Sequence, residues 1–280
     1  MTHYLTVLSI AGSDPSGGAG IQADIKTMSA LGVYAAAAVT AITVQNTRGV
    51  SRVVEVAPDV VAAQIEAVMT DLHPRVVKIG MTGSAALQQA VCQALEQAAD
   101  NNPEVVADPV LRSSSGTDLM PPEAQLYYTR HMVPRAALLT PNLPEAAVLT
   151  GMARVSTPAE VRLAAERLLG MGPRAVLMKG GHGSGSVKQD VLFWHEGGAL
   201  RSAAFTAPAV TTRNTHGTGC ALASAIAAYR ARGLTWPDAV ARAKHYVTLA
   251  LQAGAGVWAG HGAGAINHLF SPEPLILQKS

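Results

Sequence analysis

The sequence of 280 residues lacks the features that mark several large classes of protein. It has only two cysteines, so no disulfide framework is expected, and this usage suits a reducing cytoplasm. Apolar runs are broken well before the roughly 20 residues that a membrane span requires. No basic segment precedes an apolar stretch at the N-terminus, so we expect no signal peptide. The net charge of +2 predicts no binding to nucleic acid.

Several well-known ligand motifs are also missing. The glycine-rich segment Gly12–Gly20 lacks the lysine and Ser/Thr of a P-loop. Gly18–Ala23 fits the loose dinucleotide pattern, but no acidic residue occurs between Asp24 and Glu55, where the ribose partner is expected. His216 and Cys220 have no second ligand pair nearby. These absences argue against a P-loop enzyme, a nicotinamide oxidoreductase and a zinc site.

What is present is an alternation of short apolar runs with helical patterns. Leu5–Ile10 and Val105–Ala107 read as buried strands, Val33–Val44 as one or two strands, and Pro58–Leu72 as a helix. Val191–Trp194 and Arg201–Thr206 read as a hairpin, while Thr157–Glu160 is a capping box. The pattern predicts an α/β fold of three α/β/α layers with a mostly parallel central sheet. Without repeats or linkers, residues 1–280 are expected to form one domain.

Polar residues gather where the predicted strands end. Ligands of open α/β sheets bind outside the carboxyl ends of the strands, so these residues predict a common binding rim. The positions concerned are Gly12-Ser13-Asp14, Gln45-Asn46, Gly80-Met81-Thr82, Asp108, Thr140–Glu145 and Lys179.

Four rim side chains suit particular ligands. Asp108 and Glu145 offer the oxygen ligands that Mg²⁺ prefers, and Lys179 could neutralise phosphate. The Gln45 amide complements the amino and ring-nitrogen edge of an aminopyrimidine. Three of them have a plainer reading: Glu145 as a carboxylate in the first turn of a helix, Lys179 extending from a strand end, and Gln45 as a loop amide paired with backbone.

The segment Asn214–Cys220 reads as a glycine-rich turn that opens a helix. A helix start has unpaired N–H groups and a partial positive charge, so Gly217, Thr218 and Gly219 are expected to bind a transferring phosphate. The same field would favour the thiolate of Cys220, which we expect to face the group that is phosphorylated. The alternative is a helix start with glycines for tight packing. Cys92, in contrast, reads as a core residue.

Together these segments resemble the hydroxymethylpyrimidine/phosphomethylpyrimidine kinases of thiamine biosynthesis, within the ribokinase-like superfamily. The resemblance runs in family order over almost the whole chain. The matching segments are Ala11–Asp24, Val44–Thr47, Lys78–Met81, Asp108–Val110, Thr140–Glu145, Lys179–His182 and Asn214–Cys220.

The resemblance implies an enzyme that uses ATP and Mg²⁺ to phosphorylate 4-amino-5-hydroxymethyl-2-methylpyrimidine, and then its monophosphate. It also implies a ribokinase-like fold and a homodimer. Carried across, the pyrimidine site comprises Gly12, Ala19, Asp24, Gln45, Met81 and Cys220. ATP and metal would be held by Asp108, Asn142, Glu145, Lys179 and Thr218, with Gly217–Cys220 as the anion hole and Cys220 as the base.

Two other functions stay open. A pyridoxal kinase would share the fold and would also take a small aromatic heterocycle with a hydroxymethyl group. A non-catalytic pyrimidine sensor on the same fold would need neither a base nor metal ligands, so the set Asp108, Glu145, Lys179 and Cys220 speaks against it.

Overall fold

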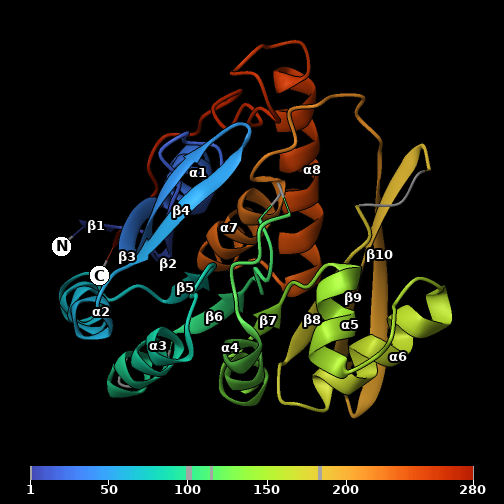
Figure 1. Cartoon of the computed structure of the whole chain (residues 1–280), viewed down its shortest axis with the longest axis horizontal. Helices are drawn as coiled ribbons and strands as arrows, with labels where there is room; N and C mark the ends of the chain where they lie inside the picture. The colour runs from blue at the N-terminus through green and yellow to red at the C-terminus, as the bar shows by residue number, and fades with distance from the viewer. Residues whose placement is uncertain (1, 99–102, 114–115, 182–184, 280) are drawn as a thin grey trace.

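The computed structural model describes residues 2–98, 103–113, 116–181 and 185–279, and a nine-stranded sheet forms its centre (Figure 1). The strand order is β10-β9-β8-β7-β6-β5-β2-β3-β4. The central six strands run parallel, while β4, β9 and β10 are antiparallel to their neighbours. These pairings confirm the predicted, mostly parallel sheet. Because parallel strands point the same way, their carboxyl ends meet at one edge of the sheet. The strands are β2 (Thr6–Ser13), β3 (Tyr34–Asn46), β4 (Gly49–Glu55), β5 (Val76–Ile79), β6 (Glu104–Ala107), β7 (Leu138–Leu139), β8 (Ala175–Lys179), β9 (Val187–Glu196) and β10 (Ala199–Pro208).

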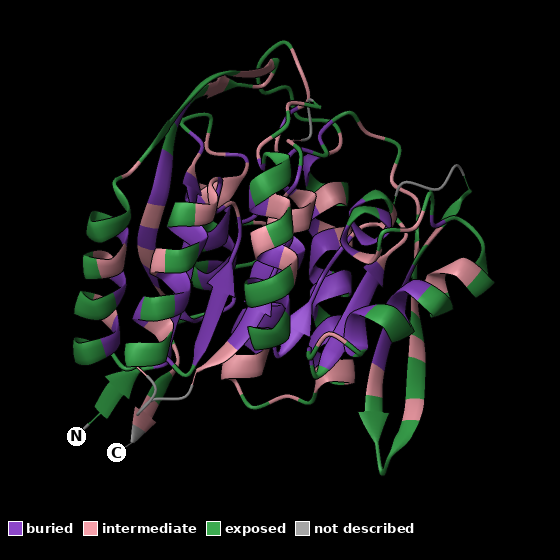
Figure 2. Ribbon diagram, turned by 60° about the horizontal axis from the view of Figure 1, so that its bottom comes forward, coloured by how far each residue is buried: buried purple, intermediate pink, exposed green. Residues whose placement is uncertain are grey.

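Helices cover both faces of the sheet and give the three predicted layers. Alternate residues of β2 show this directly, because Val7 packs into the apolar cluster of one face, and Leu8 and Ile10 into the cluster of the other. The buried interior lies between two helical layers whose outer surfaces are exposed (Figure 2). One layer contains α1 (Gly20–Ala30), α7 (Thr218–Ala231) and α8 (Trp236–Gly254); the other contains α2 (Pro58–Asp71), α3 (Ala85–Gln97), α4 (Pro122–Tyr127), α5 (Leu143–Thr150) and α6 (Pro158–Leu169).

Helix α7 is buried along most of its length. Every residue from Ala221 to Tyr229 is buried, and most are small. Small side chains let a helix approach its neighbours closely, so α7 can pack on β2, β5 and β6 and against α1 and α8 together. The start of α7 is thereby placed beside the carboxyl ends of the central strands.

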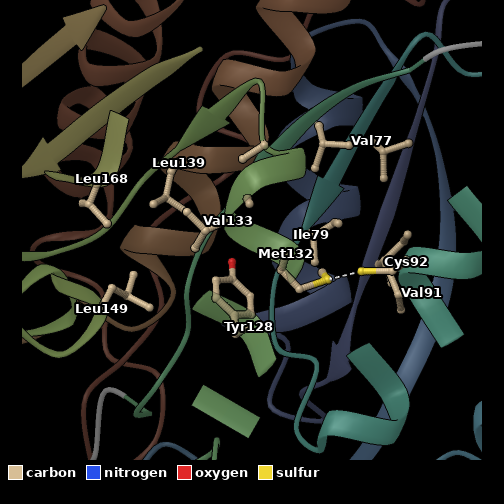
Figure 3. Packing of buried hydrophobic residues seen from close by; sticks show 14 of the residues in the cluster. Val77, Ile79, Val91, Cys92, Tyr128, Met132, Val133, Leu139, Leu149 and Leu168 are labelled. Carbon is tan, nitrogen blue, oxygen red and sulfur yellow. Dashed lines mark hydrogen bonds between the residues drawn. The ribbon is translucent and has the colours of Figure 1, made fainter. Parts of the chain in front are cut away.

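The core on the other face confirms the expectation for Cys92. This residue is 3% exposed, and its Sγ lies 3.0 Å from Met132 Sδ (Figure 3). Burial raises the pKa of the Cys92 thiol, as expected for an inert core cysteine. Tyr128 packs in the same cluster with its hydroxyl fully buried.

The structure adds detail to these expectations. The range 33–44, expected as one or two strands, lies almost wholly within the single strand β3, and helix α4 is α-helical only to Tyr127. It continues as a π-helical turn (Tyr128–Met132) and a 3₁₀ turn (Val133–Arg135), because Pro134 has no N–H to continue an α-helix. Strand β4 and the small sheet of β1 (Thr2–Tyr4) and β11 (Leu277–Lys279) were not expected. The described part of the chain has no helix long and apolar enough to cross a bilayer.

Candidate active site

The amino end of α7 presents unpaired backbone amides at the predicted rim. Gly217 precedes the helix in the left-handed region, at φ 79°. Thr218 donates both its N–H and its hydroxyl to the carbonyl of Thr215. The next two amides, of Gly219 and Cys220, have no acceptor among the described residues. Two free N–H groups at a helix start form the kind of anion site that the sequence predicts.

A lysine and a carboxylate face these amides from two strand ends. Lys179 Nζ lies 2.6 Å from Asp108 Oδ1, which also accepts a 2.9 Å hydrogen bond from Thr140. A Cβ built on Gly219 would stand 3.6 Å from Lys179 Nζ and 3.8 Å from Asp108 Oδ2. The glycine therefore keeps open the space between the helix start and the two charges. Asp108, Lys179 and Gly219 are brought together as predicted.

The two charges fix each other's protonation state. Burial would raise the pKa of Asp108, but Lys179 and Lys78 outweigh it and lower that pKa below its usual value. Burial likewise opposes the charge on Lys179, yet Asp108 and Glu145 raise its pKa. The pair is therefore ionised at neutral pH, with a cation available for phosphate oxygens.

Asn142 and Glu145 are engaged with each other at the start of α5. The backbone N–H of Asn142 donates to Glu145 Oε2 at 2.7 Å, and the N–H of Glu145 donates to the Asn142 side chain at 2.8 Å. This is a capping box, the plainer of the two readings that the sequence left open. Burial is the main cause that raises the pKa of Glu145 to about 7. The ammonium of Lys179, 4.0 Å away, lowers this pKa but does not outweigh burial. Nucleotide and metal roles for this pair stay predictions.

On the other side of the start of α7, the loop that follows β2 contacts the loop that precedes α7. Asp14 accepts hydrogen bonds from the backbone N–H groups of Ser16, Gly18 and Ala19, and its Oδ2 lies 2.8 Å from His216 Nε2. Burial would raise the pKa of Asp14, but the hydrogen bonds from His216 and Ser16 hold it at about 2. The same His216 nitrogen lies 3.2 Å from Gln45 Nε2.

The remaining residues expected around the pyrimidine divide into two groups. Gly12 and Met81 are neighbours, because a Cβ on Gly12 would stand 3.1 Å from the Met81 sulfur. Ala19 lies beside the turn that precedes α7, since a Cβ built on Gly217 would stand 3.2 Å from the Ala19 Cα. Asp24, however, points into the core: it is fully buried and both of its carboxylate oxygens contact Lys78. Its predicted contact with the pyrimidine is not favoured by this placement.

One prediction about Cys220 is wrong. The helix start was expected to lower its pKa, but burial dominates and raises the pKa of the thiol above its ordinary value. Lys78 and a hydrogen bond from the Gly20 N–H favour the thiolate without outweighing burial. Cys220 therefore carries its proton at neutral pH in this state.

The sequence reasoning placed Asp14 at the binding rim without naming its partners, and it gave no role to Lys78 or Ser224. The loop contacts of Asp14 could have been predicted, because an aspartate followed by Pro-Ser-Gly-Gly can bind the amides of its own loop. Lys78 looked like a residue inside an apolar strand, and Ser224 like one more small residue of a packed helix. His182, part of a matched segment, lies outside the described residues.

This combination defines a class: an α/β small-molecule kinase of the ribokinase-like type, with a glycine-rich turn and free helix-start amides at the strand ends. Residues 14–267 match the model of the family described as phosphomethylpyrimidine kinase. A hydroxymethylpyrimidine/phosphomethylpyrimidine kinase of Escherichia coli K12 is 44% identical over 264 residues, which cover 94% of this chain and 97% of the relative. The chain belongs to the phosphomethylpyrimidine kinase family.

Solved structures agree with this assignment. The crystal structure of a phosphomethylpyrimidine kinase from Clostridium difficile 630 has a TM-score of 0.75 at 40% identity, covering 88% of this chain and 99% of that one. A pyridoxal kinase from Staphylococcus aureus in complex with AMP-PCP and pyridoxal has a TM-score of 0.83 at 29% identity, covering 98% and 97%. The fold is therefore shared with kinases whose structures hold an ATP analogue.

We predict that Gly219→Ala folds normally but loses activity. The new methyl group has ordinary contact distances and a favourable helical position, so thermal stability should hold. It would occupy the space between the free amides, Lys179 and Asp108, and kcat/KM for ATP should fall by about 100-fold. Gly256→Ala, where a Cβ meets nothing within 4 Å, is the control. Wild-type turnover by Gly219→Ala would show that the phosphoryl group is not transferred in the space beside Gly219.

Proposed function

We propose that this chain phosphorylates 4-amino-5-hydroxymethyl-2-methylpyrimidine with ATP, and then phosphorylates the monophosphate to the diphosphate. Membership of the family supports this reaction. The observation that carries it is the pair of free amides of Gly219 and Cys220, which face the ion pair of Lys179 and Asp108. Phosphoryl transfer depends on positioning and on stabilising charge, and these groups do both.

In the proposed reaction the start of α7 receives the transferring phosphoryl group. The amides of Gly219 and Cys220 donate to oxygens on which charge develops, and the helix dipole adds to this field. Lys179 lies next to the same space and balances part of the negative charge. Because the amides are held by a buried helix, they need little reorganisation during the reaction.

The donors also suit Mg²⁺, although they do not form an all-protein site. Among the described residues, Asp108 Oδ2 accepts no hydrogen bond, so Asp108 would be the protein ligand. Mg²⁺ takes few carboxylates and keeps waters and substrate phosphates as its other ligands. When bound, it would neutralise phosphate oxygens. Glu145 was expected as a second ligand, and its capping box suggests that it instead holds the start of α5.

The pyrimidine is proposed to lie on the opposite side of the turn, among Gly12, Ala19, Gln45 and Met81. Gly12 and Met81 offer a surface without charge, which suits a flat ring. The half-buried Gln45 amide contacts His216 and accepts a hydrogen bond from the Thr43 hydroxyl, and it has further donor and acceptor capacity beyond these contacts. Cys220 lies between this side and the phosphate side, where a hydroxymethyl group would approach it.

We also propose a homodimer. Ile42, Val44 and Val54 are 52%, 54% and 45% exposed, and they lie on neighbouring strands at one edge of the sheet. A group of exposed aliphatic side chains on a β-edge favours contact with another protein surface. Sedimentation velocity should show a dimer for the wild type and a monomer for Ile42→Lys/Val54→Lys; a monomeric wild type would contradict the proposal.

Two further expectations belong to the same proposal. We infer that the chain acts as one kinase domain, because helices of both layers pack on the same sheet. We also place it in the cytoplasm, where the free thiols of Cys92 and Cys220 would remain reduced.

Parallel assays with three substrates test the proposed function. Hydroxymethylpyrimidine, its monophosphate and pyridoxal are each incubated with ATP and Mg²⁺, and the products are identified by mass spectrometry. We expect phosphorylation of both pyrimidines. Turnover of pyridoxal alone would assign the chain the activity of the pyridoxal kinases among its structural neighbours. No turnover of any of the three substrates would favour the sensor.

The role of Cys220 predicts a pH dependence that differs between the two steps. Its raised pKa means that the thiolate fraction, and the rate of a step that needs it as base, grows by about tenfold per pH unit from 7 to 9. The second step uses a phosphate that is already largely ionised, so its rate should change little. In single-turnover measurements, Cys220→Ala should slow mainly the first step and remove its pH dependence. An unchanged slope in this variant would exclude the base role.

A further inference from the structure

Helices α1 and α7 meet through two matched pairs of residues. Gly20 and Asp24 are four positions apart on α1, and Cys220 and Ser224 are four positions apart on α7, so each pair lies on one face of its helix. The Ser224 hydroxyl donates to Asp24 Oδ1 at 2.7 Å. One turn earlier, the Gly20 backbone N–H lies near enough to the Cys220 thiol to favour its thiolate form. The contact at Ser224 therefore fixes the helix turn from which Cys220 projects.

The carboxylate of Asp24 also joins the two neighbouring strands β2 and β5. Lys78 of β5 contacts both of its oxygens, at 2.9 and 2.8 Å, and Ser9 of β2 donates to Oδ2 at 2.6 Å. The four residues Ser9, Asp24, Lys78 and Ser224 are each 0% exposed. One buried carboxylate thus joins two helices and two strands directly beneath the active site.

This arrangement is not explained by stability alone. Replacing a buried ion pair by apolar residues of similar volume is often neutral or stabilising, because desolvation of the charges is costly. The position of the Lys78–Asp24 ion pair relative to Cys220 is more informative about its role than its effect on stability. Four charged groups act on Cys220: Lys78 and Asp24 of this cluster, together with Asp108 and Lys179 of the phosphate side. Gly80 leaves room for the ammonium, since a Cβ there would stand 2.8 Å from Lys78 Nζ.

We propose that Ser224 is a positioning residue for phosphoryl transfer, anchored by Asp24 and Lys78. Its hydrogen bond to Asp24 holds α7 against α1, which keeps Cys220 and the free amides at the start of α7 in the geometry that the transition state requires. The inference rests on the proposed function for its kinetic part. It assigns Asp24 to this support in place of contact with the pyrimidine.

The chain offers a matched pair of variants for the test. Ser224→Ala and Ser9→Ala each remove one short hydrogen bond from a buried hydroxyl to the same carboxylate, so both should lower Tm by a similar amount. Only Ser224 connects the carboxylate to α7. We expect Ser224→Ala to lower kcat by about tenfold with both KM values within about twofold, because small displacements of catalytic groups reduce turnover. Ser9→Ala should stay within about twofold of wild-type kcat.

A second readout does not depend on turnover. Iodoacetamide labelling of Cys220, followed by peptide mass spectrometry, should be several-fold faster in Ser224→Ala than in wild type, because the start of α7 is less tightly held. Ser9→Ala should label at the wild-type rate. The charge-neutral double variant Asp24→Asn/Lys78→Met removes the anchor itself and should reduce kcat as Ser224→Ala does.

The outcomes separate this inference from the proposed function. Wild-type kcat and labelling in Ser224→Ala would overturn it. Equal losses in Ser224→Ala and Ser9→Ala would also overturn it, because the cluster would then be a structural support only. If the wild-type protein phosphorylates none of the substrates, the proposed function fails, while the labelling contrast still decides whether Ser224 holds Cys220.

Discussion

The close approach of two glycine-rich loops is the constraint on which the site depends. A Cβ on Gly217 would stand only 1.7 Å from the carbonyl oxygen of Gly18, and a Cβ on Gly18 would stand 2.5 Å from the His216 ring. The two backbones therefore touch, and Asp14 joins the same loops through His216. Because of this contact, the start of α7 lies directly beside the residues that follow β2. A phosphate on one side and a small heterocycle on the other could then be separated by little more than one cysteine side chain.

Electrostatics divides the site into a charged part and a supporting part. The ion pair of Lys179 and Asp108 lies at the rim, next to the free amides, and can act on a ligand. The ion pair of Lys78 and Asp24 lies wholly inside and contacts helices and strands only. Burial keeps the Cys220 thiol protonated between the two pairs. A substrate that excludes water and brings a phosphate would change the field on this sulfur, so its ionisation belongs to the reacting complex.

The fold could be predicted from the sequence because its signals are local. Apolar runs and the capping box at Thr157 each report on a few neighbouring residues, and the structure confirms the parallel sheet between two helical layers. The rim could be predicted as well, because it follows from strand ends. What could not be predicted was which polar residues bind each other. Asp24 is paired by Lys78 from 54 positions away and by Ser224 from 200, and no local pattern reports such contacts. The thiolate of Cys220 was expected from the helix dipole, and the prediction failed because burial of the side chain outweighs that field.

The central claim is that the start of α7 holds the phosphoryl group as it moves to the pyrimidine hydroxyl. A crystal structure with a non-hydrolysable ATP analogue, Mg²⁺ and hydroxymethylpyrimidine tests it most directly. The account predicts γ-phosphate oxygens at about 2.7–3.1 Å from the amide nitrogens of Gly219 and Cys220, with Lys179 beside them and the hydroxymethyl group on the side of Cys220. A γ-phosphate bound away from these amides, with the pyrimidine also in place, would contradict it.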